Sequence, residues 1–248
     1  MQIDDIERAA ALHWQPPDTE RLGEWLLRAA AGFTGRANSA LPVGDPGLPL
    51  SETVAAVTDW YRRRGLPPMI AVPGVLLAGS PPNSLETFLA ERAWVSRPGP
   101  AFVMTADVAD IRLPAADTDF RLDPEPDAGW LALYRYRGQE LPPIARTMLM
   151  SAPWQAFGSI RRDGRQVAVG RISIGAGWAM ITAVEVDPSS RRQGLGAAIT
   201  GKLTAAAAAR GARRIQLQVE ETNAPAVALY TRCGFKLSHR YHYRIAPA

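Results

Sequence analysis

The sequence predicts an α/β protein built from two similar units. In the first half, the expected elements run in the order strand, strand, helix, strand, helix, strand, and the second half repeats this order. Moving the first half forward by 146 positions, without gaps, places Pro42 on Pro188 and Gly65 on Gly211. Element boundaries coincide over roughly 45 residues of this alignment, which indicates an internal duplication.

Hydrophobic periodicity and end signals place the elements of the first half. A short helix is expected at residues 5–12, and Pro16 and Pro17 interrupt the chain after it. The next elements are strands at 24–31 and 33–42, a helix at 51–64, a strand at 69–72, a helix at 83–94 and a strand at 101–105. A polar, proline-containing linker is expected at 106–119.

The second half is interpreted in the same way. Asp163 and Gly164 form the expected turn of a hairpin between strands at 155–161 and 166–174. The other elements are a strand at 120–122, helical stretches at 128–136 and 142–154, a strand at 181–186, a helix at 195–210, a strand at 217–219, a helix after Asn223 and a strand at 238–245.

Composition restricts the class of protein. The 248 residues are 47% hydrophobic and 21% charged, and the formal net charge of +4 gives no case for nucleic-acid binding. No apolar run approaches the roughly 18 residues of a membrane span, and the amino terminus lacks the apolar core of a signal peptide. The single cysteine, Cys233, excludes an internal disulfide and fits a reducing compartment. A cytoplasmic protein without a membrane or nucleic-acid partner is expected.

The segment from Ile181 to Thr200 has the pattern of a buried strand, a polar loop and a helix. Gly194 and Gly196 lie where the helix begins, so backbone N–H groups without intrahelical partners are exposed to an anion. Arg191 and Arg192 beside them add forked donors suited to phosphate oxygens. The segment therefore predicts a pyrophosphate site.

Other interpretations of this segment are a tight turn with two solvated arginines, or another nucleotide site. The phosphate loop of nucleotide triphosphatases needs Gly-Lys-Ser/Thr, which is absent. A dinucleotide fold needs a third glycine where this chain has Ile199, although Glu220 and Glu221 lie at a tolerable distance for its acidic residue.

The pattern Arg191-x-x-Gly194-x-Gly196 resembles the acyl-CoA signature of the GNAT N-acyltransferase superfamily. Downstream, the segment from Asn223 through Tyr230 to Gly234-Phe235 resembles the second signature of that family. The resemblance implies two GNAT-like units, each a mixed, mostly antiparallel sheet flanked by helices. It also implies a layout similar to tandem-GNAT enzymes such as mycothiol synthase, with units at 1–115 and 118–248.

The two units differ where the family binds its cofactor. The residues aligned with Arg191–Gly196 are Asp45–Leu50, whose prolines remove N–H donors, and Leu89 replaces Tyr230. We therefore expect a degenerate first unit and an active second unit.

The resemblance implies acetyl transfer from acetyl-CoA, as co-substrate, to a primary amine by direct attack. The partners expected are acetyl-CoA and an amine on a small molecule, peptide or protein, with residues 142–154 near the acceptor; the chain is expected to be a monomer or a homodimer. The residues implied in cofactor binding are Val184, Glu185, Val186, Arg191, Arg192, Gln193, Gly194, Leu195, Gly196, Ala197, Asn223 and Tyr230.

Two catalytic roles follow from the resemblance. Tyr230 occupies the position of the proton donor to the leaving thiolate, and the alternative is a core tyrosine. Glu185 is the best candidate for the general base, with Glu220 and Glu221 in reserve, and ordered water can replace a dedicated base.

Two other assignments have an alternative interpretation: the role of Asn223 and the function of the protein. Asn223 could be a helix cap, a cofactor contact or both. An acyl-CoA-binding regulator without turnover is the alternative function. The histidine spacing supports no metal site.

Overall fold

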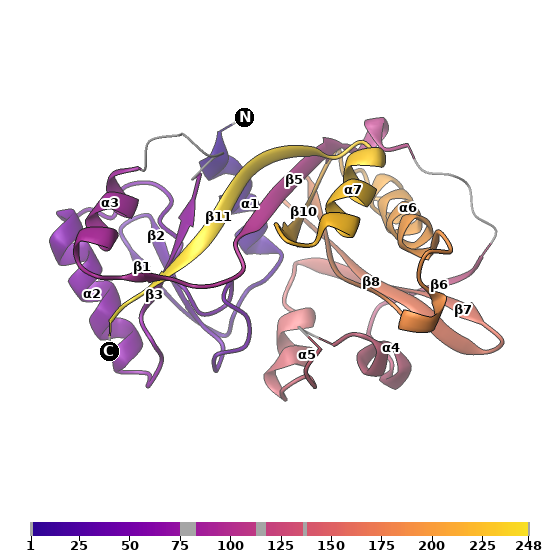
Figure 1. The fold of residues 1–248 in the computed structure, drawn as a ribbon, viewed down its shortest axis with the longest axis horizontal. Coiled ribbons are helices and arrows are strands. Elements are labelled where there is room, and N and C mark those ends of the chain that lie inside the picture. Colours follow the sequence, from indigo (N-terminus) through magenta and orange to yellow (C-terminus); the bar gives the residue numbers. More distant parts are fainter. Residues whose placement is uncertain (1, 75–82, 113–117, 136–137, 248) are drawn as a thin grey trace. The chain divides into compact units, whose positions relative to one another are not determined.

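The computed structural model describes residues 2–74, 83–112, 118–135 and 138–247 (Figure 1). The chain forms two compact units. The first consists of Met1–Val103, Glu220–Thr222 and Ser238–Ala248, and the second of Met104–Val219 and Asn223–Leu237. Strand β5 (Ala101–Asp107) carries the chain from the first unit into the second. Among the described residues, no helix is both long and apolar enough to cross a membrane.

These units divide the chain differently from the ranges 1–115 and 118–248. The last strand, β11 (Lys236–Ile245), pairs with β3 (Met69–Pro73) and β4 (Val95–Ser96), so the end of the chain belongs to the first unit. The domain boundaries 1–115 and 118–248 remain a prediction from the sequence. The predicted linker lies partly outside the described residues, and η1 (Val108–Asp110) is a single turn within it.

Among its described residues, the first unit contains a hairpin, strands of the nine-stranded sheet and three helices. Strands β1 (Asp18–Leu22) and β2 (Trp25–Ala29) form the hairpin. The helices are α1 (Ile3–Leu12), α2 (Leu50–Arg62) and α3 (Ser84–Glu91). Helix α3 begins at Asn83, whose side chain accepts a hydrogen bond from Glu86 N, as expected of a helix cap. The core gathers apolar side chains from α2, α3 and the strands, including Val57, Trp60, Ile70 and Leu89.

In its described part, the second unit contains five neighbouring strands of the nine-stranded sheet, in the order β10-β9-β8-β7-β6. Only β9 and β10 are parallel, so the sheet is mostly antiparallel, in agreement with the predicted fold class. The strands are β6 (Asp119–Asp123), β7 (Trp154–Arg162), β8 (Arg165–Gly175), β9 (Trp178–Val186) and β10 (Arg214–Glu220). The helices are α4 (Ala128–Leu133), α5 (Ile144–Leu149), α6 (Leu195–Ala208) and α7 (Ala224–Arg232), and η2 (Pro188–Ser190) is a single turn.

Helices cover both faces of this sheet (Figure 1). A Cβ at Gly158 would lie 2.8 Å from Leu203 of α6, so glycine lets that helix approach the strands. The neighbouring Phe157 points to the other face, where it meets Trp130 of α4 edge-on at 5.1 Å.

The internal repeat predicted from the sequence is visible in the positions of the elements and in the way their strands pair. A shift of 146 positions places α2 on residues 196–208, which lie within α6, and β3 on residues 215–219 within β10. Leu41 forms an antiparallel bridge with Leu26, and Ala40 forms a parallel bridge with Ile70. Strand β9 is likewise antiparallel to β8 and parallel to β10.

The expected strand at 33–42 is wrong. Only the isolated bridges at Ala40 and Leu41 remain, because Asn38 supplies the hydrogen bonds that a ladder would have supplied. Its side chain accepts from Ala30 N and Gly32 N and donates to Phe33 O and Thr34 O, at 2.7–2.9 Å. The helix expected at 142–154 is restricted to α5, and β1 is a strand that the pattern missed.

Candidate active site

Strands β9 and β10 pair over only part of their length. The parallel register runs from Trp178 opposite Arg214 to Ile181 opposite Leu217. Beyond this point β9 continues to Val186 and β10 to Glu220 without further pairing to each other. Backbone groups at the end of β9 therefore face a gap in the sheet that an extended ligand can fill by hydrogen bonding.

A β-bulge redirects β9 where this gap begins. Val169 pairs with Glu185 but Arg171 pairs with Thr182, so Ala183 and Val184 together lie opposite the single residue Gly170. Ala183 has a φ of 55°, in the left-handed region that an L-residue rarely adopts. The bulge puts Val184 on the α6 face and Glu185 on the opposite face.

The loop after β9 leads into α6 through a tight turn. Asp187 accepts a hydrogen bond from Ser189 N, and Pro188–Ser190 forms the single turn η2. The hydroxyl and then the backbone N–H of Ser189 hold the pKa of Asp187 below its ordinary value. Arg192, at φ 65°, and Gly194, at φ 80°, then turn the chain into the helix.

The amino end of α6 carries no side-chain cap. In the part of the chain that the structure describes, no acceptor receives the backbone N–H groups of residues 194–197, and Ala198 N makes the first bond of the helix. Four free donors at the positive end of a helix dipole form an anion site. Gly196 also lies close to α7, because a Cβ there would be 3.1 Å from Leu229 Cδ2.

Two side chains of the predicted phosphate site are held by other groups. Arg191 turns back along β9: its Nη2 lies 3.1 Å from Oε1 of Glu185, and its Nε donates to Val186 O at 3.2 Å. The Gln193 side chain accepts a hydrogen bond from Arg162 at the end of β7. In this arrangement the Arg191 guanidinium is free for another anion only after it has left Glu185. Neither contact was predicted from the sequence pattern.

Tyr230 lies on α7, directly after Leu229. The side chain is 8% exposed, and its ring meets Phe235 edge-on at 5.9 Å. Burial, with a smaller contribution from Cys233, raises the pKa of Tyr230 above its ordinary value, so the phenol stays protonated at working pH. Burial raises the pKa of the Cys233 thiol as well.

Asn223 is the cap of α7. Its side-chain oxygen accepts from Ala226 N at 3.3 Å, and its carbonyl accepts from Ala226 N and Val227 N. The reserve carboxylates, Glu220 and Glu221, belong to the first unit, and Glu221 forms an ion pair with Arg240 at 2.9 Å. Among the described residues there is no group of three or more potential metal ligands.

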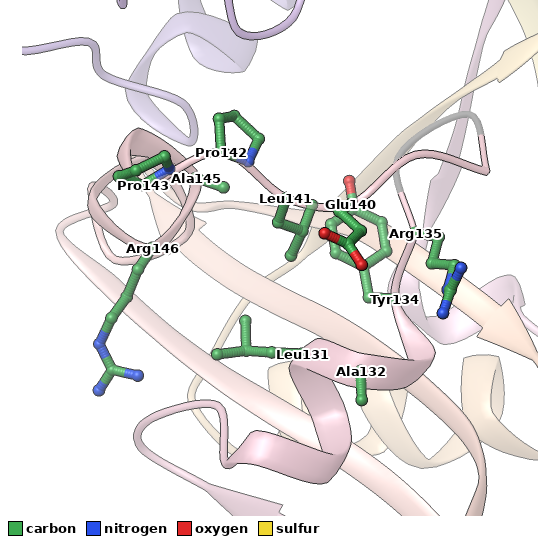
Figure 2. Close-up of a pocket in the computed structure, with 10 residues that line it drawn as sticks. All are labelled: Leu131, Ala132, Tyr134, Arg135, Glu140, Leu141, Pro142, Pro143, Ala145 and Arg146. Atoms are coloured by element: carbon green, nitrogen blue, oxygen red, sulfur yellow. The ribbon is translucent and has the colours of Figure 1, made fainter.

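A pocket of about 470 Å³ lies between α4 and α5 (Figure 2). The side chains of Leu131, Tyr134, Glu140 and Leu141 point into it. Its other lining residues come from α4, from α5 and from the segment that joins them. The resemblance to the family implied that residues 142–154 lie near the acceptor, and Glu140 falls outside that range.

The first unit has closed the corresponding site. Ala40, the counterpart of Val186, donates to Met69 O and accepts from Ala71 N, both at 2.9 Å, so no gap exists beside it. Before α2, Glu24 accepts from Asp45 N, and the Asp45 side chain accepts from Gly47 N. Carboxylates of the protein therefore accept backbone N–H groups in the loop that leads into α2.

Fold and comparisons agree on the class of protein. A structure described as a GCN5-related N-acetyltransferase from Kribbella flavida superposes with a TM-score of 0.71 at 15% identity, covering 99% of this chain and 96% of that one. A tandem GNAT protein from the clavulanic acid biosynthesis pathway gives a TM-score of 0.67 at 16% identity, with coverage of 99% and 88%. The chain has the tandem GNAT fold.

Sequence relatives identify the family. The "uncharacterized N-acetyltransferase YobR" of Bacillus subtilis is 28% identical over 250 residues, 98% of each chain. The family model described as "probable histone acetyltransferase Rv0428c C-terminal" matches residues 1–244. The chain belongs to this family and is a GNAT-type N-acyltransferase, as the sequence predicted. These relatives do not favour the alternative of a regulator without turnover.

Proposed function

We propose that the second unit transfers an acetyl group from acetyl-CoA to a primary amine by direct attack. The observation that carries this proposal is the gap between β9 and β10 beyond Ile181, next to the free N–H groups at the start of α6. The gap suits the extended pantetheine arm, and the N–H groups suit the diphosphate. The name of the family model refers to a histone acetyltransferase, which supports a protein amine as one class of acceptor.

Each residue has a role in this proposal. Val184 and Val186 offer backbone groups to the pantetheine and the thioester, and Arg191, Arg192 and residues 193–197 bind the diphosphate. Glu185 takes a proton from the amine, directly or through water, after the amine nitrogen attacks the carbonyl carbon. The carbon–sulfur bond then breaks, and the neutral phenol of Tyr230 donates a proton to the thiolate. Asn223 caps α7 and contacts the cofactor arm.

The Arg191–Glu185 pair connects cofactor binding with catalysis. Diphosphate attracts Arg191 more strongly than the single Glu185 carboxylate does, because it offers more oxygens and more charge. Departure of Arg191 leaves Glu185 and the Val186 carbonyl free for substrate. The proposal therefore favours binding of acetyl-CoA before the amine.

Thiol release tests the proposal. The full chain, acetyl-CoA and a panel of polyamines, amino sugars, amino acids and peptide amino termini are expected to give amine-dependent release of CoA. Calorimetry is expected to show binding of acetyl-CoA and CoA but not NAD. Acetyl-CoA binding without release by any amine would instead support a regulator, and preferential binding of NAD would support a dinucleotide site.

A further inference from the structure

Arg171, in the middle of β8, connects three elements of the second unit. The side chain is fully buried, and because the neighbouring Gly170 faces α6, Arg171 lies on the opposite face of the sheet. Its Nε donates to Leu149 O at 2.7 Å, and its Nη1 donates to Ser173 Oγ at 3.2 Å and to Thr182 Oγ1 at 3.3 Å. One side chain therefore ties the end of α5 to β8 and β9.

The contact with α5 fixes the position of the guanidinium. Leu149 is the last residue of α5 and is fully buried. A helix leaves its last carbonyls without intrahelical donors, and arginine is a common partner for them. Arg171 is thus anchored in the core of the second unit, and its bond to Thr182 holds β9 against a fixed point.

Thr182 lies where β9 separates from β10. Ile181 is the last residue of β9 in register with β10, and Ala183, with its φ of 55°, begins the bulge. Thr182 is therefore the one residue between the paired part of β9 and the bulge. The bond from Arg171 acts at the position where the gap in the sheet opens.

The bulge decides which face of the sheet Glu185 takes. In a regular strand, residues three apart lie on opposite faces, so Thr182 and Glu185 would point in opposite directions. Because two residues of β9 lie opposite Gly170, Glu185 instead shares the face of Thr182 and Arg171. Loss of the bulge would turn Glu185 toward α6 and shift the backbone groups at the end of β9.

We propose that Arg171 is a positioning residue for acetyl transfer: anchored on α5, it holds Thr182 and thereby the bulge that presents Glu185 and the end of β9 to the substrates. This inference rests on the proposed function for the roles of Glu185 and β9. Because Arg171 is fully buried, it acts through Thr182 and not on a reactant.

Two hydroxyl groups that accept from the same nitrogen give a matched test on the full chain. Thr182→Val keeps the shape of the side chain and removes the hydroxyl next to the bulge, whereas Ser173→Ala removes the other hydroxyl. Ser173 lies opposite Met180, in the part of β9 that is still paired with β10, which makes it the control.

Turnover with acetyl-CoA and the best amine of the panel is expected to distinguish these variants. Thr182→Val should lower kcat about tenfold, because a misplacement of about 1 Å costs about 100-fold and one lost bond shifts the strand by less. Ser173→Ala should stay within about twofold of wild type. Thr182→Ser, which retains the hydroxyl, should recover most of the rate lost in Thr182→Val.

A double-mutant cycle identifies Arg171 as the partner of Thr182. Arg171→Lys keeps the charge but lacks the planar fork that serves Leu149 and Thr182 together, so kcat should again fall about tenfold. In the double variant the two losses should not multiply, because both remove one contact. Losses that multiply would overturn the inference. Equal losses in Thr182→Val and Ser173→Ala would do so as well, and that comparison holds even where Arg171→Lys does not fold.

Hydrogen exchange separates this inference from the proposed function, because it needs no turnover. The backbone of residues 182–187 is expected to exchange faster in Thr182→Val than in wild type or Ser173→Ala, since the bulge loses its support. Faster exchange there, without thiol release by any amine, would overturn the proposed function and retain Arg171 as the support of the bulge. Full thiol release by Thr182→Val with unchanged exchange would retain the proposed function and overturn the positioning role.

Discussion

At the scale of single residues, Tyr230 shows how burial sets the form in which a side chain acts. Its raised pKa keeps the phenol neutral across the working range, so the residue can donate a proton but does not itself titrate near neutrality. A neutral donor of this kind stabilises a leaving thiolate through a hydrogen bond as charge develops.

Tyr230→Phe is expected to lower kcat about 100-fold, the lower end of the range for general acid–base catalysis. Acetyl-CoA affinity should stay within about twofold of wild type, because the role proposed for the hydroxyl is on the leaving group and not on the ground state. Turnover and calorimetry measure the two quantities, and the wild-type rate should show no loss assignable to Tyr230 up to about pH 9. A weakened affinity at full kcat would instead identify a packing residue.

The Arg191–Glu185 pair predicts that substitutions of its two residues have opposite effects on the affinity for acetyl-CoA. Arg191→Ala should weaken acetyl-CoA binding about tenfold, since a charged hydrogen bond contributes about 1.5–3 kcal/mol. Glu185→Gln should tighten it by up to about fivefold, because the pair is 57% and 30% exposed and competes only modestly. Calorimetry measures both, with Arg62→Ala on α2 as the matched control. If Glu185→Gln weakened binding, the two groups would not compete.

At the scale of elements, α4 depends on one carboxylate. Asp127 accepts from Trp130 N at 2.7 Å as the cap of α4, and it also meets Gln166 and Arg161. The Trp130 N–H is the main cause that holds the pKa of Asp127 below its ordinary value, and Gln166 and Arg161 add to it. Because the pKa is depressed in the folded state, the stabilisation is complete above pH 3.8 and is lost as the pH falls below it.

Asp127→Ala is expected to lower the free energy of unfolding by about 1 kcal/mol at pH 7, the usual effect of removing a cap. Asp127→Asn should retain part of the stability, since its oxygen still accepts from the helix. Urea unfolding of both variants measures this, and the difference from wild type should shrink below pH 3.8 as the wild-type carboxyl is protonated. A difference independent of pH would contradict a role for the ionised cap.

Local signals in the sequence were sufficient for some elements and not for others. The hairpin at Asp163-Gly164 was predictable because both residues adopt a positive φ, 50° and 76°, as its two-residue turn requires. Equally local patterns predicted the helix cap at Asn83. They also predicted the buried face of α6, which is formed by Leu195, Ile199 and Leu203. No hydrophobic periodicity predicts the turn around Asn38 or the pairing of Arg191 with Glu185. Both depend on side-chain contacts that form only when the chain has folded.

At the scale of the whole molecule, one duplicated plan has produced two different sites. The helix that begins with free donors in the second unit has its counterpart in α2, where Glu24 and Asp45 already accept the nearby N–H groups. The carbonyl of Ser39, the counterpart of Glu185, accepts from the buried Arg28 at 3.0 Å. Leu89, which replaces Tyr230, is fully buried in the core. The counterparts of the β9 backbone groups and of Tyr230 are therefore used within the first unit.

This asymmetry predicts one acetyl-CoA per chain despite two copies of the unit. In the first unit a diphosphate would meet Glu24 and Asp45 in the loop that leads into α2, and pantetheine would have to break the bonds between Ala40 and β3. Calorimetry with acetyl-CoA should give a stoichiometry of about one, and Arg191→Ala should weaken that single event. A second event that survives in Arg191→Ala would place a functional cofactor site in the first unit and refute its assignment as degenerate. Glu24→Gln is the matched probe of that unit, and it should leave the stoichiometry unchanged, because the closed sheet at Ala40 excludes the cofactor arm whether or not the carboxylate is present.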